Sequence, residues 1–369
     1  MPTNNAAWLN KPKGTPLVVK SAPYTSPGED EIVVKNGAVA INPIDWVLQA
    51  SGTTLMYSWL PDPCIMGSDV AGEVVEVGSS VTRFKVGDRV LGYALGREEK
   101  RNRVAECGFQ TYTVLLEDMV TPIPSDMSYE TASVIPLGFS TAACGLFQKD
   151  QLGLALPTLD PTPKGQTVLV WGGSTSVGCN GIQLAVAAGY EVFTTASPKN
   201  FDLVRKLGAS QVFDYRSRTV VADIIQAFKG KIAAGALSVG HGAADACMAV
   251  LAHCEGNRFV AMATYPVPSP PPKVLPLPRT IFTYMSWILI NTIKSKFTGV
   301  RYKFIFGSTL AFNEVGKAMF QDFLPDALAK GKYIAAPDPM VIGKGLDQIQ
   351  AALDLHRKGV SARKIVVSL

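Results

Sequence analysis

The stretch from Thr167 to Asn200 constrains the fold more than any other part of this sequence. It opens with an apolar, β-branched run, Thr167–Trp171, which has no alternation and is typical of a strand buried on both faces of a parallel sheet. A glycine-rich turn follows at 172–178, then apolar residues at helical spacing up to Gly189, and then a second apolar run at 191–195. This order of strand, glycine turn, helix and strand predicts a βαβ unit with a nucleotide-binding turn.

The composition of the turn suits the binding of an anion. A helix N-terminus carries unpaired backbone N–H groups and the positive end of the helix dipole, and glycines let a pyrophosphate approach the backbone closely. The turn reads Gly172-Gly173 followed by Gly178, which departs from the GxGxxG pattern of dinucleotide-binding folds. We therefore expect phosphate binding here. The alternative, that the glycines only allow close packing of the helix on the sheet, stays open.

The residues after the second strand indicate which nucleotide binds. Folds that bind NAD place an Asp or Glu about twenty residues past the glycines, where it holds the ribose 2′-OH. In this sequence that place reads Thr194-Thr195-Ala196-Ser197-Pro198-Lys199-Asn200, with hydroxyls, an amide and a cation and without a carboxylate. Such a segment would accept a 2′-phosphate, so the sequence favours NADP(H) over NAD(H).

Length and composition limit the function further. The chain has 369 residues, enough for two domains that each bury a core, and its apolar content of 47% is typical of a globular protein. A formal net charge of +5 without a basic block argues against nucleic-acid binding. The first residues carry no basic-then-apolar signal, so we expect a cytoplasmic protein. Six scattered cysteines without a CxxC, and only three histidines, predict no metal site.

We expect an α/β protein with three segments. Residues 1–165 combine many short strands with glycine turns, which is typical of a compact, partly closed β-domain. Residues 166–335 continue the βα rhythm as a nucleotide-binding domain, and residues 336–369 end in a strand that should return to the first domain. Within the first domain, the charge-dense run from Arg97 to Arg103 is interpreted as a solvated surface loop, and a helix is expected to begin after Ser140.

The later part of the nucleotide-binding domain contains three unusual segments. Residues 244–246 are interpreted as strand material, and residues 265–279 hold seven prolines, which predicts an irregular loop. The strongly apolar segment Ile281–Ile293 predicts a helix that is too short to span a bilayer. We expect this helix at a subunit interface or over a substrate pocket. Attachment to a membrane surface, helped by nearby lysines and arginines, is the lesser alternative.

Four motifs occur in order along the chain: Ala40-Ile41-Asn42-Pro43-x-Asp45, Gly67-x-Asp69-x-Ala71-Gly72-x-Val74, Val86-Gly87-Asp88-Arg89-Val90 and the turn at 172–178. Together they resemble the medium-chain dehydrogenase/reductase superfamily over nearly the whole chain. The resemblance implies a GroES-like β-domain paired with a Rossmann domain, which has a doubly wound parallel sheet. Zinc-dependent members carry Gly-His-Glu where this chain has Gly67-Ser68-Asp69, and they carry four closely spaced cysteines that are absent here. A zinc-independent member, with no metal ligands, is therefore implied.

Further segments are similar to fungal trans-acting enoyl reductases that serve polyketide synthases. These segments are Pro136-x-Gly138-x-Ser140-Thr141-Ala142, Gly172-Gly173-Ser174-Thr175, Ser197-Pro198-x-Asn200-Phe201-Asp202-Leu203, Val212-Phe213-Asp214-Tyr215 and Arg357-Lys358-Gly359. The resemblance implies NADPH as the cofactor, and the expected contacts are Asp45, Trp46, Val47, Ser174, Thr175, Ser176, Val177, Ser197, Lys199, Asn200, Tyr215, Met262, Ala263, Leu355 and His356. It also implies a substrate pocket lined by Leu137, Gly138, Phe139, Ser140, Thr141, Thr283, Met285 and Trp287.

The activity implied by this resemblance is NADPH-dependent reduction of an enoyl thioester, presented by a carrier domain of a polyketide synthase. Thr141 is the first candidate for polarising the thioester carbonyl, and Tyr284 is a second candidate, as a proton donor. Val47 stands where such enzymes often have a lysine. Two alternatives stay open: a quinone or free-enone reductase, and a non-redox cyclase or binding partner on a retained nucleotide-binding fold. The resemblance permits a monomer or a homodimer.

Overall fold

The computed structural model describes residues 2–52, 57–267 and 276–369. The chain forms two compact units: unit 1 consists of Met1–Ser140 and Ser308–Leu369, and unit 2 consists of Thr141–Gly307. The sequence suggested boundaries at residues 165 and 335, so the chain passes from one unit to the other earlier than expected at both places.

Side-chain contacts explain these earlier crossings. The chain after Ser140 packs on the parallel sheet of unit 2, where Gln151 Nε2 donates a hydrogen bond to the backbone oxygen of Phe304 (3.1 Å). The chain after Gly307 packs within unit 1 instead, where Thr121 Oγ1 donates to the backbone oxygen of Phe320 (2.7 Å). Both connecting segments therefore belong to the unit that their side chains contact.

Unit 2 is built on a sheet whose strands are all parallel. These strands are β9 (Gln166–Trp171), β10 (Glu191–Ala196), β11 (Gln211–Asp214), β12 (Ile232–Ser238), β13 (Glu255–Gly256), β14 (Phe259–Met262) and β15 (Arg301–Phe304). Their order is β11-β10-β9-β12-β14-β15, and β13 pairs with β12. Strand β9 lies between β10 and β12, and its apolar run is buried because helices cover both faces of the sheet, as the sequence predicted.

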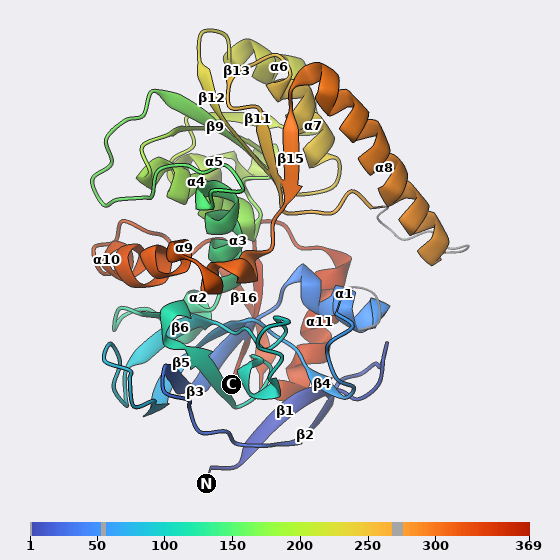
Figure 1. The fold of residues 1–369 in the computed structure, drawn as a ribbon. Coiled ribbons are helices and arrows are strands. Elements are labelled where there is room, and N and C mark those ends of the chain that lie inside the picture. The colour runs from blue at the N-terminus through green and yellow to red at the C-terminus, as the bar shows by residue number, and fades with distance from the viewer. Residues whose placement is uncertain (1, 53–56, 268–275) are drawn as a thin grey trace. The chain divides into compact units, whose positions relative to one another are not determined.

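Helices cover both faces of this sheet. They are α4 (Ser176–Ala187), α5 (Phe201–Lys206), α6 (Val220–Ala227), α7 (Ala243–Leu251) and α8 (Pro276–Thr298). Leu169 and Trp171 of β9 share a core with α6 and α7. Val170 faces the other way, toward α4, where a Cβ atom on Gly181 would lie 3.7 Å from its side chain. Figure 1 shows α6, α7 and α8 on one side of the sheet and α4 on the other. The order β9, α4, β10 confirms the predicted βαβ unit.

Unit 1 contains two sheets of mainly antiparallel strands. The smaller sheet has the order β2-β1-β4, with β1 (Asn4–Leu9), β2 (Val18–Ala22) and β4 (Cys64–Ile65). The larger sheet has the order β16-β17-β3-β5-β6-β8, with β7 paired to β3. Its strands are β3 (Glu31–Ala40), β5 (Asp69–Val77), β6 (Arg89–Tyr93), β7 (Tyr112–Leu116), β8 (Val120–Pro122), β16 (Pro339–Lys344) and β17 (Lys364–Ser368).

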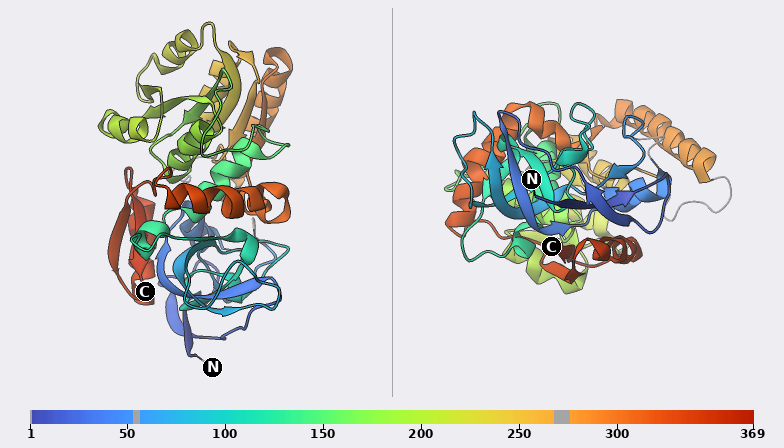
Figure 2. Two further views of the ribbon diagram at one scale, coloured as in Figure 1. Left: turned by 90° about the vertical axis from the view of Figure 1, so that its left-hand side faces the viewer. Right: turned by 90° about the horizontal axis from the view of Figure 1, so that it is seen from below.

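The last strand joins the larger sheet of unit 1, where it lies between β16 and β3. Strand β17 pairs with β3 in antiparallel register, with Val367 opposite Val39. The prediction that the C-terminal strand returns to the first domain is therefore confirmed, and Figure 2 shows both chain ends among the strands of unit 1. The helices of unit 1 are α1 (Pro43–Ser51), α2 (Tyr129–Ala132), α9 (Glu314–Lys317), α10 (Leu324–Ala329) and α11 (Ile349–Lys358), and α3 (Pro136–Phe147) runs from unit 1 into unit 2.

Two helix predictions need correction. A helix was expected to begin after Ser140, but α3 begins at Pro136. Proline suits the first turn of a helix, where its missing N–H is not needed, and the next amide, Leu137 N, donates to Asp69 Oδ1 (2.6 Å). Residues 244–246 were interpreted as strand material but lie in α7. Alanine has a high helix propensity, which outweighs the apolar character of this short run.

The proline-rich segment also differs from its prediction. An irregular loop was expected over 265–279, but α8 begins at Pro276, because the first turn of a helix tolerates proline. Residues 268–275 of that prediction lie outside the described residues. The predicted helix at Ile281–Ile293 is confirmed within α8, and several of its apolar side chains are exposed, Phe282 by 74%. Within the described ranges, no helix combines the length and the apolar character needed to cross a membrane.

Candidate functional site

The glycine turn of unit 2 is closed by contacts that leave no room for side chains. Gly172 has a φ of +85°, and its N–H donates to Thr195 Oγ1 (2.9 Å). A Cβ atom on Gly173 would lie 2.1 Å from Thr194 Oγ1, and one on Gly178 would lie 2.2 Å from the backbone oxygen of Gly172. The glycines therefore let β10 and α4 pack directly against the turn, so the close packing named by the alternative interpretation is present.

The start of α4 is also arranged as a place for an anion. Thr175 is its N-cap: Thr175 Oγ1 accepts a hydrogen bond from Gly178 N (3.0 Å) and donates one to the backbone oxygen of Gly172 (2.7 Å). The amides of Ser176 and Val177 belong to the first turn, whose N–H groups have no partner within a helix. The buried Ser176 Oγ has no hydrogen-bond partner among the described residues. Donors without partners at a helix N-terminus fit a phosphate group.

The segment after β10 lies beside this turn. Strand β10 ends at Ala196, and a 3₁₀ helix follows at Pro198–Asn200. Asn200 Nδ2 donates to Ser174 Oγ (3.3 Å), so two separately predicted parts of the cofactor site meet. The first carboxylate after β10 is that of Asp202, whose side chain is fully exposed and pairs with Arg205 (3.5 Å). The end of β10 therefore offers hydroxyls, an amide and the exposed Lys199.

Tyr215 follows the neighbouring strand, β11. Its side chain is 46% exposed, and the guanidinium of Arg216 lies over its ring, 5.7 Å from the centroid. Arg216 Nε also donates to Asp214 Oδ1 (3.3 Å), and Asp214 is the register partner of Ala196. An exposed aromatic ring with a cation beside it therefore lies one strand away from Ser197 and Lys199.

The other residues predicted in unit 2 lie on three different elements. Met262 is buried at the end of β14, and Ala263 N donates to the backbone oxygen of Ser238 (2.9 Å). Thr141 lies inside α3, where a Cβ atom on Gly307 would approach Thr141 Oγ1 to 2.9 Å. The helix that was expected to begin after Ser140 begins at Pro136 instead, so Thr141 lies in the middle of α3 and not in its first turn.

The predicted residues of α8 point in different directions. Trp287 Nε1 donates to both carboxylate oxygens of Asp245 on α7 (3.0 Å each). The Tyr284 ring packs edge-on against Tyr265, with 5.9 Å between centroids. Met285 is 57% exposed, and Thr283 is exposed as well. Trp287 is therefore a packing residue of unit 2, while Thr283 and Met285 remain accessible.

The start of α3 contributes the predicted substrate residues of unit 1. Phe139 is fully buried and packs edge-on against Phe320 and Tyr333, with centroid distances of 5.3 and 5.8 Å. Ser140 is buried too, and its Oγ has no hydrogen-bond partner among the described residues. The structure thus places Phe139 in the core of unit 1. The only contact given for Leu137 among the described residues is the hydrogen bond from its backbone amide to Asp69 Oδ1.

Asn42 and Asp45 of the Asn-Pro-x-Asp motif in unit 1 belong to a buried network of charged side chains. Arg97 NH1 lies 3.0 Å from Asp45 Oδ1, and Lys364 Nζ lies 2.8 Å from Asp69 Oδ2. Asn42 joins the two pairs: its backbone N–H donates to Asp45 Oδ2 (2.8 Å), its Nδ2 donates to Asp69 Oδ2 (2.8 Å), and its Oδ1 accepts from Lys364 Nζ (2.5 Å). No side chain of these pairs is more than 8% exposed. The network balances two cations against two carboxylates.

Arg97 also contacts Ser68, which stands where the zinc-dependent enzymes described above have the histidine of Gly-His-Glu. Arg97 NH2 donates to Ser68 Oγ (2.5 Å), and the backbone oxygen of Arg97 accepts from Trp59 Nε1 (3.0 Å). Burial raises the pKa of the nearby Cys107 thiol to about 12, so this thiol is protonated at neutral pH. Across the described residues, no group of three or more His, Cys, Asp or Glu side chains is placed to hold a metal ion.

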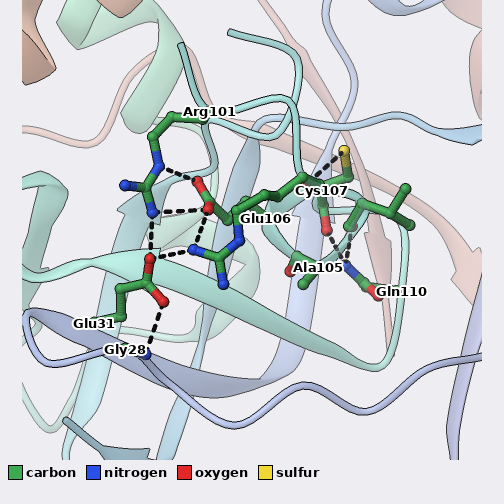
Figure 3. Close-up of polar contacts among 9 residues, drawn as sticks. Gly28, Glu31, Arg101, Ala105, Glu106, Cys107 and Gln110 are labelled. Carbon is green, nitrogen blue, oxygen red and sulfur yellow. Dashed lines mark hydrogen bonds and ion pairs between the residues drawn. The ribbon is translucent and has the colours of Figure 1, made fainter. Parts of the chain in front are cut away.

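The loop that carries Arg97 is anchored by a second ion-pair cluster. Figure 3 shows Arg101 beside the carboxylates of Glu31 and Glu106, which are almost completely buried. Arg103 pairs with the same two carboxylates. Burial would raise the pKa of Glu31, but hydrogen bonds from Arg103, from the Gly28 amide and from Arg101 lower it below its ordinary value. The prediction of a solvated surface loop at 97–103 is correct for the exposed residues Glu99, Lys100 and Asn102. It is wrong for the three arginines, because these are paired with buried acids.

The remaining predicted residues of unit 1 lie on α1 and α11. Trp46 Nε1 donates a hydrogen bond to His356 Nδ1 (3.1 Å), and both side chains are half-buried. Trp46 and Leu355 also pack against the core of unit 1. Burial and the nearby Lys364 cation lower the pKa of His356 to about 4. The imidazole is therefore neutral at pH 7.

Sequence reasoning missed Arg97, Lys364 and Ser68 as members of this arrangement. The only available signal was the Asn-Pro-x-Asp motif itself, since a buried acid needs a buried cation. Neither cation lies near Asp45 or Asp69 in the sequence.

Comparisons with known proteins agree with this architecture. The family model described as an alcohol dehydrogenase GroES-like domain matches residues 28–125, and the model described as zinc-binding dehydrogenase matches residues 176–299. The chain is 59% identical to the dehydrogenase pigH of Monascus ruber, over the full length of both proteins. The chain belongs to the medium-chain dehydrogenase/reductase superfamily.

Two further similarities bear on this superfamily assignment. The trans-enoyl reductase himH of Aspergillus japonicus is 38% identical, covering 99% of this chain and 97% of that protein. The crystal structure of an alcohol dehydrogenase superfamily protein from Novosphingobium aromaticivorans covers all of both chains, with a TM-score of 0.74 and 25% identity. The predicted pairing of a GroES-like domain with a Rossmann domain is thereby confirmed, and the chain is a member of an oxidoreductase superfamily.

Proposed function

We propose that this chain is an NADPH-dependent enoyl reductase that acts on an α,β-unsaturated acyl thioester. The observation that carries the cofactor choice is the segment after β10, which has no carboxylate and is joined to the phosphate turn by the bond from Asn200 to Ser174. A carboxylate at this place would repel a 2′-phosphate, whereas Ser197, Lys199 and Asn200 offer donors and a positive charge.

The residues of unit 2 would hold the cofactor along its length. The N-terminus of α4, with Ser176 Oγ and the amides of Ser176 and Val177, would bind the pyrophosphate. Lys199 and Asn200 would bind the 2′-phosphate, and the exposed ring of Tyr215 would stack on the adenine. When bound, the reduced nicotinamide supplies a hydride from its C4 to the β-carbon of the substrate.

Side chains of the protein would then manage the charge that develops on the substrate. Hydride addition leaves an enolate on the thioester oxygen, and a proton must reach the α-carbon to complete the reduction. Thr141 is the proposed donor to this oxygen, and Tyr284 the proposed proton donor. The comparison that supports an acyl thioester is the likeness to a trans-enoyl reductase, which also supports delivery by the carrier domain of a polyketide synthase.

We propose further that the reaction needs no zinc. At Ser68, where the zinc-dependent relatives have a histidine, the hydroxyl accepts a hydrogen bond from Arg97. A guanidinium this close to Ser68 and Asp45 places positive charge where a metal cation would have to bind, and the two would repel each other. The place therefore lacks the ligands of a zinc ion, and its electrostatic potential is unfavourable for a cation.

A titration with NADPH and NADH, followed by nicotinamide fluorescence, tests the cofactor assignment. NADPH should bind at least ten times more tightly than NADH, and Lys199→Gln should remove about tenfold of NADPH affinity without changing NADH affinity, since one phosphate contact contributes about 1.4 kcal/mol. Lys206→Gln is the matched control, because Lys206 is an exposed lysine on the adjacent helix. Binding of neither nucleotide would refute the oxidoreductase assignment and favour a cyclase or a binding protein.

Turnover on three substrates tests the chemistry. An enoyl thioester should be reduced with a higher kcat/KM than a free enone or a quinone of similar size. A preference for the quinone, with normal NADPH binding, would replace the proposed substrate class and leave the cofactor assignment intact.

A further inference from the structure

Helix α8 of unit 2 carries large apolar side chains on the face that it leaves exposed. Its opposite face packs on unit 2, where the Trp287 ring lies edge-on against Tyr302 of β15, with 5.1 Å between centroids, and Trp287 Nε1 donates to Asp245 of α7 (3.0 Å). Figure 1 shows α8 along the outside of unit 2, next to α7. On its outward face, Leu289 is 63% exposed and Phe297 is 87% exposed.

The exposed side chains form a stripe along this helix. Residues three or four positions apart share one face of a helix. This spacing joins five exposed residues, which we call the α8 stripe: Phe282, Met285, Leu289, Ile293 and Phe297. A surface helix of a globular protein ordinarily turns a polar face toward water, and exposed apolar patches mark surfaces that bind proteins or lipids. The α8 stripe therefore predicts a partner that offers apolar groups.

The charges around the α8 stripe have one sign. Between Glu255 and Glu314 the sequence contains no acidic residue, whereas it contains several lysines and arginines. Lys294 and Lys296 lie in the last turns of α8, and both are exposed. Lys303, which follows in β15, pairs with Asp150 (2.5 Å) and so contributes less positive charge. A partner that complements this surface is apolar and negatively charged.

The shape of the surface favours a lipid partner over a protein. The outward face of a single helix is a convex ridge, and the hollow beside α8 is lined by residues of α7 and of the other side of α8, such as Asn291 and Ser295, and not by the stripe. A second copy of α8 would bring Lys294 and Lys296 toward the same cations, and the helix has no acid to pair with them. Acyl chains adapt to a ridge, and anionic headgroups attract lysines.

We propose that α8 binds the surface of a membrane that contains anionic lipids. The α8 stripe enters the boundary between headgroups and acyl chains, and Lys294 and Lys296 lie among the lipid phosphates. The helix lies in the plane of this surface. This inference goes beyond the proposed reductase function and does not depend on it.

Cosedimentation of the full chain with vesicles tests the lipid assignment. The wild type should bind vesicles of phosphatidylserine and phosphatidylcholine in equal parts at least about tenfold more tightly than vesicles of phosphatidylcholine alone. Raising the salt to about 1 M, where the Debye length is about 3 Å, should weaken this binding. Equal binding to both kinds of vesicle, or binding to neither, would overturn the proposal.

Two sets of substitutions test the residues. The triple variant Leu289→Gln, Ile293→Gln and Phe297→Gln should weaken binding to the anionic vesicles by at least about 100-fold, since it removes buried apolar area. Lys294→Gln with Lys296→Gln should weaken it by about 30-fold.

Matched controls change exposed residues of unit 2 outside α8. Lys206→Gln with Lys229→Gln removes the same charge, and Leu156→Gln with Ile232→Gln removes exposed apolar side chains. Both controls should bind the vesicles as the wild type does. Losses as large as those of the α8 variants would overturn the role of α8.

A local probe tests whether the stripe itself enters the lipid. All six cysteines of the chain are buried, so a cysteine introduced at an exposed position can be labelled selectively. A polarity-sensitive fluorophore on Leu289→Cys should shift its emission to shorter wavelength when anionic vesicles are added, and the same label on Ile232→Cys should not. An unchanged emission at position 289, although the protein sediments with the vesicles, would overturn the role of α8.

Three further outcomes would replace the lipid with another occupant. A dimer that the triple variant abolishes, seen by analytical ultracentrifugation without vesicle binding, would assign α8 to a second copy of the chain. A complex with an isolated acyl carrier domain that needs the α8 stripe, again without vesicle binding, would assign it to an acidic protein. A lower kcat/KM of the triple variant on a thioester, with vesicle binding unchanged, would assign it to the substrate pocket.

The failure of this inference can be told apart from the failure of the proposed function. Wild-type protein that binds NADPH and reduces a thioester but binds no vesicles refutes only the membrane surface. Wild-type protein that binds anionic vesicles through α8 but binds no NADPH refutes only the reductase.

Discussion

The two units use charge in different ways. In unit 1, the carboxylates of Asp45 and Asp69 are fully buried and each meets a buried cation. In the described part of unit 2, every ion pair keeps about a third or more of its side chains exposed, as in Lys231–Glu191. Buried charges must be paired to be tolerated, whereas exposed pairs contribute little to stability.

This difference shows how each unit holds its own candidate residues in place. In unit 1, one charge network around Asn42 connects the first turn of α1, the first residue of β5 and the first residue of β17. Unit 2 relies on backbone packing at Gly173 and Gly178, and it leaves the donors at the start of α4 available for an anion. Unit 1 should therefore be sensitive to the loss of a single charge, and unit 2 to the gain of a single methyl group.

The largest expected effect comes from breaking the buried pair of Lys364. Lys364→Met leaves the Asp69 carboxylate buried without its cation, which should lower the free energy of unfolding by about 3–5 kcal/mol. Urea denaturation followed by circular dichroism measures the loss. The matched control is Arg363→Met, since the neighbouring Arg363–Asp338 pair is more than half exposed and should contribute less than about 1 kcal/mol. Equal effects of the two substitutions would contradict the role assigned to the network.

A methyl group at Gly173 tests the packing of unit 2. In Gly173→Ala the added Cβ would lie 2.1 Å from Thr194 Oγ1, so β10 or the turn must move. We expect a loss of about 1–3 kcal/mol in stability and at least about tenfold in NADPH affinity. Gly230→Ala is the comparison: its Cβ would meet nothing within 4 Å, and its φ of +75° should cost about 1 kcal/mol without an effect on NADPH binding. Unchanged cofactor affinity in Gly173→Ala would argue against the turn as the phosphate site.

The neutral histidine of unit 1 predicts a dependence of stability on pH. The pKa of His356 is about 4 in the folded protein, below its ordinary value of about 6.5. Between these values the unfolded chain binds more protons, so this contribution is complete above pH 6.5 and is lost as the pH falls toward 4. The half-buried ring limits the expected loss to about 1–2 kcal/mol. Urea midpoints at pH 7 and pH 5 should therefore differ less for His356→Gln than for the wild type, and identical differences would contradict the assignment.

The parts of the fold that depend on local pattern could be predicted from the sequence. The βαβ unit at 167–195, the helix within α8 and the closing strand all follow from hydrophobic periodicity and glycine placement. The helix α7 was missed because the three residues 244–246 are too few to show helical periodicity, and their apolar character was given more weight than the helix propensity of alanine. The start of α3 was predicted too late, after Ser140, although proline suits the first turn of a helix and α3 begins at Pro136.

The charge network could not be predicted in the same way. Arg97 lies in a run of charged residues that looks like a solvated loop, and its burial follows only from its contacts with Asp45 and Ser68. The partner of Lys364 is Asp69, from the opposite end of the chain. Periodicity describes neighbours along one element and carries no information on such pairs. The glycine turn was predictable because all of its parts lie within one βαβ unit.

The smallest expected effect is that of breaking the exposed Lys231–Glu191 pair of unit 2, which tests the contrast between buried and exposed ion pairs. Lys231 Nζ lies 2.6 Å from Glu191 Oε2, a shorter contact than that between Lys364 and Asp69 in unit 1, yet about a third of each side chain is exposed. Water therefore solvates both charges when the pair is broken, and Lys231→Gln should cost no more than about 1 kcal/mol by urea denaturation. Glu191 also accepts from Thr167 Oγ1 (2.7 Å), so the carboxylate keeps a partner in this variant. If Lys231→Gln were as destabilising as Lys364→Met, distance rather than burial would govern these pairs, and the contrast between the units would fail.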